Sequence, residues 1–111
     1  MSILPPKSEP KKLDFQAINR AALHRLPDLL SRWLPGGQQV GREWCVKNPK
    51  RGDRHAGSFK VNTSTGRWAD FATGDKGGDP VSLAAWLFDL KQSEAAVRLA
   101  DMLGIDQGGR A

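Results

Sequence analysis

Hydrophobic residues recur at helical spacing in the first third of the chain. Asp14 is placed to cap a first helix, and Pro27 should interrupt or restart it because proline is tolerated only in a first helical turn. From there the apolar positions follow one helical face: Leu26, Leu29, Leu30 and Trp33. The Pro-Gly-Gly run at 35–37 should end that helix, since glycine can adopt the left-handed cap.

The middle of the chain changes to the alternating pattern of half-buried strands. Residues 39–46 predict a first strand. Phe59 and Val61 alternate with polar neighbours and predict a second one. A turn cluster ending at Gly66 and the aromatic residues of 67–71 predict a returning third strand. This part of the chain is therefore expected to form a β-hairpin beside one further strand.

The last third returns to helical spacing. The glycine-rich residues 74–78 should not continue a strand, and Asp79 followed by proline predicts the start of a helix. Ser93 is expected to cap a final helix that ends at Gly104. The apolar faces of these two helices are Val81, Ala84, Ala85 and Phe88, then Ala96, Leu99, Ala100 and Leu103.

These elements predict a small α+β domain in which a three-stranded antiparallel sheet is flanked by three to four helices. The chain has 111 residues, which is enough for one core but not for two. We expect a single domain over residues 13–105, with disordered tails at 1–12 and 106–111 because both are polar or rich in proline and glycine.

The composition narrows the class of protein. No apolar run approaches the ~20 residues of a membrane span, and the N-terminus lacks a secretory core, so a cytoplasmic location is expected. Cys45 is the single cysteine, so no disulfide can form within the chain. With only His24 and His55 besides, a cysteine-rich structural zinc site has too few ligands.

The positive charge is concentrated in one region. The net charge is +5, and residues 42–67 hold seven basic residues against two acidic ones, while the rest of the chain is balanced. A localised excess of this kind favours a polyanionic partner over a merely soluble surface. The densest part is the loop of residues 47–57, where the candidate phosphate contacts are Lys47, Lys50, Arg51, Arg54 and His55. The alternative is a solvated loop without a ligand.

Further candidates lie on the predicted hairpin and after it: Lys60, Arg67, Trp68 and Lys76. Trp68 could point outward and stack on a base, or it could be a buried core ring, and the alternation fits both. The run 74–79 could bind an anion at a helix N-terminus, but it lacks the spacing of a nucleotide-binding phosphate loop, and a helix cap explains Asp79 better.

No arrangement of residues supports catalysis. Asp53 and Asp70 have no acid–base spacing that would fix their distance, and nothing in the sequence orients His55 as a base for Cys45. The chain is therefore expected not to be an enzyme and to need no cofactor.

Several short motifs, in this order, resemble the N-terminal zinc-binding domain of bacterial and phage DNA primases. They are Trp44-Cys45, the segments 57–61 and 66–71, the run Gly77-Gly78-Asp79, and the closing segment from Glu94 to Gly104. The similarity runs from about Leu26 to Ile105 and is greatest to modules of plasmid, phage and other mobile-element replication proteins.

The resemblance also shows a departure at the metal ligands. Cys45, Asn48, Asp70 and Thr73 stand where zinc-bearing members carry their four ligands. One thiolate, an amide, a carboxylate and a hydroxyl make a poor zinc site, because the metal prefers sulfur and imidazole donors. We therefore expect a metal-free form in which apolar packing replaces the metal, with these aromatic residues as the substitutes: Trp44, Phe59, Trp68 and Phe71.

The resemblance and the charge together predict a non-catalytic module that binds single-stranded DNA in a phage, plasmid or mobile-element primase or replication system. The alternative is an adaptor that docks a primase, polymerase or helicase without binding DNA. Exposed apolar residues at Trp86, Leu87 or Leu90 would favour that alternative.

Overall fold

The structure is a computed structural model that describes residues 14–48 and 58–104. The two predicted tails and most of the basic loop lie outside these residues. The described elements, in chain order, are α1 (Phe15–His24), α2 (Leu26–Trp33), β1 (Gln38–Val40), β2 (Glu43–Val46), β3 (Phe59–Asn62), β4 (Trp68–Asp70), β5 (Lys76–Gly77), α3 (Pro80–Phe88) and α4 (Gln92–Leu103). The predicted α+β class is confirmed.

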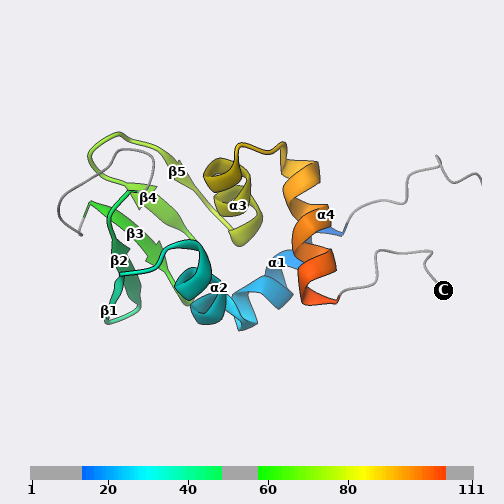
Figure 1. Ribbon diagram of the computed structural model, residues 1–111, viewed down its shortest axis with the longest axis horizontal. Coiled ribbons are helices and arrows are strands. Elements are labelled where there is room, and N and C mark those ends of the chain that lie inside the picture. The colour runs from blue at the N-terminus through cyan, green and yellow to red at the C-terminus, as the bar shows by residue number, and fades with distance from the viewer. Residues whose placement is uncertain (1–13, 49–57, 105–111) are drawn as a thin grey trace, which may run out of the picture.

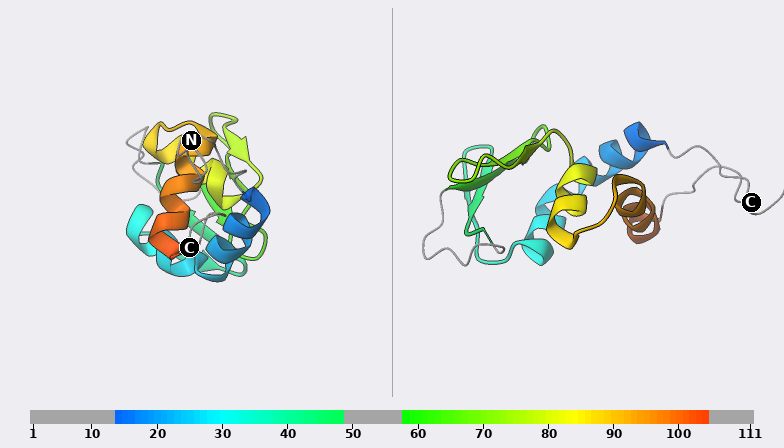
Figure 2. Two further views of the ribbon diagram at one scale, coloured as in Figure 1. Left: turned by 90° about the vertical axis from the view of Figure 1, so that its right-hand side faces the viewer. Right: turned by 90° about the horizontal axis from the view of Figure 1, so that it is seen from above.

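The sheet and the helices form two parts of one molecule. Figures 1 and 2 show the strands at one end and α1, α3 and α4 at the other, with α2 beside the sheet. Helix α1 packs against α3 and α4, and the two last helices pack against each other. A single hydrophobic core runs through both parts and includes Leu30, Phe59, Val81 and Leu99. Among the described helices, none is long and apolar enough to cross a membrane.

The helix starts follow local chemistry, with one correction. Asp14 caps α1 by accepting a hydrogen bond from the Ala17 N–H at 3.0 Å, and Asp79 caps α3 as predicted. The prediction for Ser93 is wrong, because Lys91 is the N-cap of α4 and the Glu94 carboxylate accepts from the Lys91 N–H at 3.0 Å. Glu94 at the third helical position reaches back to this N–H, which fixes the start two residues earlier than Ser93 implied.

The sheet has five antiparallel strands in the order β1-β2-β3-β4-β5, so the predicted number of three is wrong. The predicted strand over residues 39–46 is a hairpin, in which Val40 pairs with Glu43 across a two-residue turn. Gly41 has a φ of +62° and permits this turn. The fifth strand pairs Trp68 with Gly77 and Ala69 with Lys76, although its glycine-rich sequence argued against a strand.

Glycine is required in β5 for a packing reason. A Cβ atom on Gly77 would lie 2.4 Å from Nε1 of Trp68 and 2.5 Å from Oγ of Ser82. The backbone of β5 therefore lies directly over the indole ring, where only glycine fits. The low strand propensity of glycine is outweighed by the contact that its missing side chain allows.

The two faces of the sheet differ sharply. On the inward face, Phe59 and Val61 of β3 and Trp68 of β4 are buried in the core. Of the four aromatic residues expected to replace the metal's contribution, Phe59, Trp68 and Trp44 pack in or against the core. Phe71 does not, because 72% of its side chain surface is exposed. It follows Asp70 and so falls on the outward side of the alternation.

Candidate nucleic-acid interface

The outward face of the sheet carries a row of register-matched residues. Cys45 of β2 is opposite Lys60 of β3, Lys60 is opposite Ala69 of β4, and Ala69 is opposite Lys76 of β5. Residues directly opposite each other in antiparallel strands point to the same face. Two lysines from separate predicted elements are therefore placed on one surface by strand pairing alone.

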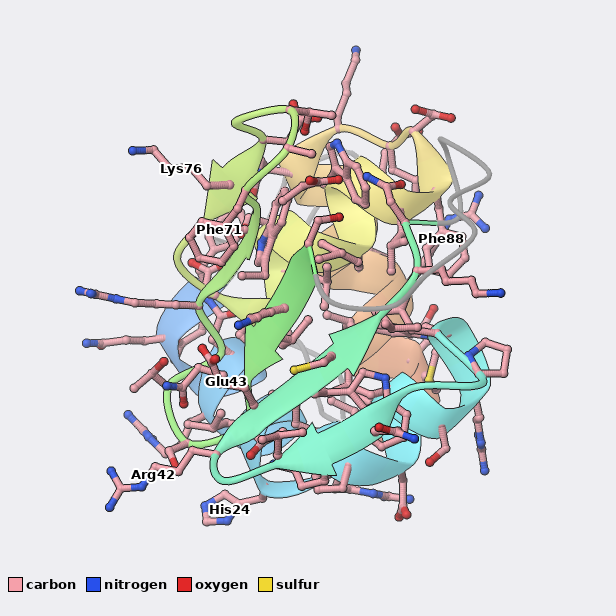
Figure 3. All side chains as sticks on the ribbon, turned by 90° about the vertical axis from the view of Figure 1, so that its left-hand side faces the viewer. His24, Arg42, Glu43, Phe71, Lys76 and Phe88 are labelled. Carbon is pink, nitrogen blue, oxygen red and sulfur yellow. The ribbon has the colours of Figure 1, made fainter. Side chains whose placement is uncertain are left out.

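An exposed aromatic ring lies in the middle of this surface. The ammonium nitrogen of Lys60 is 5.8 Å from the centre of the Phe71 ring, within the range of a cation–π contact. The same nitrogen is 3.9 Å from a carboxylate oxygen of Glu43, across the β2–β3 pair. Figure 3 shows Phe71, Glu43 and Lys76 on one side of the molecule, with Phe88 on the other.

These residues surround an open hollow of about 640 Å³. We call this surface the outward hollow, and its lining side chains are Glu43, Lys60, Asn62, Arg67, Trp68, Ala69, Phe71 and Lys76. Arg67 and Lys76 are exposed and Lys60 is half-buried. Three cationic side chains thus face one carboxylate around a phenyl ring. This arrangement suits a ligand that has both negative charge and flat rings.

Trp68 borders this hollow, but its ring is buried. Its side chain is 5% exposed, and the indole Nε1–H donates to Oγ of Ser82 at 3.0 Å. The ring centre is 5.1 Å from that of Trp86 and 6.1 Å from that of Phe59, the latter in an edge-to-face arrangement. Of the two interpretations of the sequence, the buried core ring is the one that this geometry supports. The expectation that Trp68 stacks on a base is corrected by its burial.

Sequence reasoning assigned Phe71 to the core and missed its exposure on the outward face. The only signal available was its position one residue after Asp70, in phase with Ala69 rather than with Trp68. Because both phases of this short strand contain one aromatic residue, the alternation did not separate them. The exposed ring in this part of the sheet is Phe71.

The basic loop can be placed only in part. Lys47 is exposed directly after β2. The remaining loop candidates, Lys50, Arg51, Arg54 and His55, lie outside the described residues, as does Asp53. Their contribution to binding stays a prediction from charge.

The turn before α3 is organised as a helix cap. The Ser82 N–H donates to Oδ1 of Asp79 at 2.8 Å, and Ser82 Oγ accepts from the Asp79 N–H at 3.3 Å. This reciprocal pair is a capping box, which satisfies both backbone donors internally. The helix-cap interpretation of Asp79 is confirmed. The Asp79 carboxylate would also repel an anion at this helix start.

The four positions aligned with metal ligands do not form one donor set. Asn48 and Asp70 are buried, and Nδ2 of Asn48 donates to Oδ2 of Asp70. Thr73 is exposed and its hydroxyl donates to Oδ2 of Asp75 at 2.9 Å. Cys45 lies in the outward row opposite Lys60. Within residues 14–48 and 58–104, no group of three or more His, Cys, Asp and Glu side chains is placed to hold a metal ion.

One comparison with known proteins, that with solved structures, supports this fold. No family model matches the chain, and no curated protein matches it. Among solved structures, the chain is similar to a crystal structure of Aquifex aeolicus primase that contains the zinc-binding and RNA polymerase domains, with a TM-score of 0.71 and 25% sequence identity. The match covers 86% of this chain and 22% of that one, and it lies in the zinc-binding domain.

The similarity thus spans nearly all of this chain and only about a fifth of the primase chain. It includes the zinc-binding domain and not the catalytic one. It relates the fold of this chain to that of a primase domain. The chain is similar to a primase zinc-binding domain, as its sequence motifs predicted.

Proposed function

We propose that this chain is a non-catalytic module that binds single-stranded DNA in the primase or replication system of a phage, plasmid or other mobile element. The observation that supports this most directly is the exposed Phe71 ring among Lys60, Arg67 and Lys76. The similarity of the fold to a primase domain supports a role in replication. We place the module in the cytoplasm, where such a system works.

In the proposed mechanism, phosphate contacts and base stacking make separate contributions to affinity. Cationic side chains contact successive phosphates, and each neutralised phosphate releases counterions. Phe71 provides a flat surface on which one base can stack, and stacking tolerates any base. Binding is therefore strongly dependent on salt and weakly dependent on sequence.

Lys60 has a particular place in this mechanism. Its ammonium group lies near both the Phe71 ring and the Glu43 carboxylate. A base on Phe71 would take the position over the ring, and the flexible lysine side chain could then turn to the attached phosphate. Glu43 opposes this step because its charge attracts Lys60 and repels phosphate.

The proposed mechanism also assigns phosphate contacts to the basic residues between β2 and β3. The basic loop connects β2 to β3, the two strands that carry Glu43 and Lys60. Its charged residues would contact further phosphates of the bound DNA: Lys47, Lys50, Arg51, Arg54 and His55.

A fluorescence anisotropy titration with a labelled oligothymidine tests the proposal. The intact chain should bind at low salt, and the logarithm of its affinity should fall linearly with the logarithm of the salt concentration. Arg98→Ala, on α4 and away from the sheet, is the matched control for loss of one positive charge (Figure 1). Absence of binding at low salt would refute the proposal.

A second candidate function is the adaptor, which one observation favours. A hollow of about 570 Å³ between α2, α3 and α4 is lined by Trp33, Phe88 and Met102 among others. Phe88 is 50% exposed and Met102 is 47% exposed. Trp86, Leu87 and Leu90, whose exposure would have favoured an adaptor, pack against the core instead.

Co-purification separates the two functions. An adaptor should retain a primase, polymerase or helicase from the same replication system, lose it on Phe88→Ala, and show no affinity for the oligonucleotide. A DNA-binding module should bind the oligonucleotide equally well with Phe88→Ala, because this residue lies on the helical part of the molecule.

A further inference from the structure

The end of β2 and the turn after β4 are joined by a buried polar pair. Asn48 is 1% exposed and Asp70 is completely buried, although they are 22 residues apart in the chain. The Asn48 amide donates to Oδ2 of Asp70. A carboxylate is costly to bury unless it is hydrogen-bonded, so this contact ties the two segments together.

The other oxygen of Asp70 organises the turn itself. Oδ1 accepts hydrogen bonds from the backbone N–H of Ala72 at 2.7 Å and of Thr73 at 3.3 Å. The backbone carbonyl of Asp70 accepts from the Gly74 N–H at 2.8 Å, which closes the turn. One side chain therefore holds a tight five-residue turn and links it to the segment just after β2.

Asn48 and Asp70 each belong to a pair of positions with the spacing of zinc ligands. Residues 45 and 48 are three apart, as are 70 and 73, and structural zinc sites use two such pairs. The part of the similar primase structure that matches this chain is its zinc-binding domain. In this chain the donors do not fit zinc, because Cys45 supplies the one soft ligand and Asn48 and Asp70 are already bonded to each other.

We propose that the Asn48–Asp70 pair takes the structural place of the metal, so that the fold is held without zinc. The pair links the same two segments that a metal with ligands at 48 and 70 would link. This extends the prediction that apolar packing replaces the metal, because the replacement also includes a buried hydrogen bond. The inference depends on the fold and not on DNA binding.

Isosteric exchange of the two side chains tests the pairing. Asn48→Asp puts a second carboxylate against Asp70 without a change in volume, and the melting temperature should fall by roughly 10–20 °C. Asp70→Asn alone keeps an acceptor for the turn and should lower it by only a few degrees. The double variant Asn48→Asp/Asp70→Asn restores one donor opposite one acceptor and should recover at least half of the loss.

Asn62→Asp is the matched control. Oδ1 of Asn62 accepts from the N–H groups of Ser64 and Thr65, and an aspartate keeps that acceptor. Its melting temperature should stay within roughly 3 °C of the wild type. Should Asn48→Asp behave like this control, or should the double variant melt no higher than Asn48→Asp, the pairing is refuted. If Asn48→Asp does not fold alone, recovery of folding in the double variant still decides the question.

Metal content is the second readout. The purified wild-type chain should contain less than about 0.1 equivalent of zinc by elemental analysis, and a strong chelator should leave its melting temperature unchanged. Stoichiometric zinc, or a chelator-induced fall in melting temperature, would overturn the proposal. Neither measurement involves DNA, so failure here is distinguishable from failure of the proposed function.

Discussion

The two faces of the sheet differ: the inward face stabilises the core, and the outward face is the proposed binding surface. On the inward face the aromatic rings of Phe59, Trp68 and Trp86 pack together, and the polar groups there are bonded within the protein. On the outward face Phe71, Arg67 and Lys76 are exposed, and Lys60 is half-buried. Residues in and just after β4 thus lie in opposite environments, because successive side chains of a strand point to opposite faces.

This difference teaches that the type of residue does not decide its role here. Trp68 and Phe71 are both aromatic and three positions apart, yet only the first stabilises the core. Asp70 is charged and still belongs to the inward face, because Asn48 and two backbone N–H groups satisfy it. The partners that the sheet supplies determine which residues are structural.

The largest expected effect comes from exchanging the two aromatic residues for alanine. Trp68→Ala should lower the free energy of unfolding by about 3–5 kcal/mol, since it removes a buried ring and its bond to Ser82. Phe71→Ala should change it by less than about 0.5 kcal/mol. Urea denaturation followed by circular dichroism measures both.

Phe71→Ala should have a large effect on oligonucleotide affinity, in contrast to its small effect on stability. The alanine variant should bind single-stranded DNA about 5- to 100-fold more weakly, as expected for loss of one stacked base. A folded Phe71→Ala protein with wild-type affinity would remove Phe71 from the interface and leave only the charges.

The next effect is a difference in stability between alanine variants of two adjacent glycines, Gly77 in β5 and Gly78 just after it. A Cβ at Gly77 would clash with the Trp68 ring and Ser82, whereas a Cβ at Gly78 meets no atom within 4 Å. Gly77→Ala should therefore cost about 1–3 kcal/mol of unfolding free energy, and Gly78→Ala less than about 0.5 kcal/mol. Equal stability of the two variants would show that β5 does not lie over the indole.

A smaller effect is expected from single charges of the outward hollow. Alanine at Lys60, Arg67 or Lys76 should each lower the slope of log affinity against log salt by about 0.7, the value for one phosphate of a single strand. Arg98→Ala should leave this slope unchanged. If all four variants reduce the slope equally, the binding is diffuse and not located on the sheet.

The smallest expected effect is a gain. Glu43→Gln removes the carboxylate 3.9 Å from the Lys60 ammonium and should raise affinity for single-stranded DNA about two- to five-fold. Because the two side chains of this ion pair remain 34% and 42% exposed, water screens their attraction and the melting temperature should change little. A loss of affinity would mean that Glu43 positions Lys60 instead of competing for it.

The sequence predicted the helical part of the fold well because its signals are local. Caps, prolines and apolar stripes act within a few residues, and the start of α1, the break at Pro27 and the end at Gly104 all follow from them. The motif order likewise predicted the similarity to a primase domain.

The sheet was less predictable because its pairing partners are distant in sequence. The first strand was expected to be continuous, although Gly41 marks a turn. The fifth strand depends on the Trp68 ring beneath Gly77, which no local pattern reveals. The faces of β4 were ambiguous for the same reason, because the partner that makes Asp70 acceptable inside is Asn48, two residues past the end of β2.

Mapping of the bound surface tests the central claim most directly. In a titration of the ¹⁵N-labelled chain with oligothymidine, backbone amide shifts should change most at Lys60, Ala69, Phe71 and Lys76, on the outward face. The amides around Phe88 and Met102 should hardly move. Changes concentrated on α3 and α4, or none at concentrations where the anisotropy assay shows binding, would contradict the account.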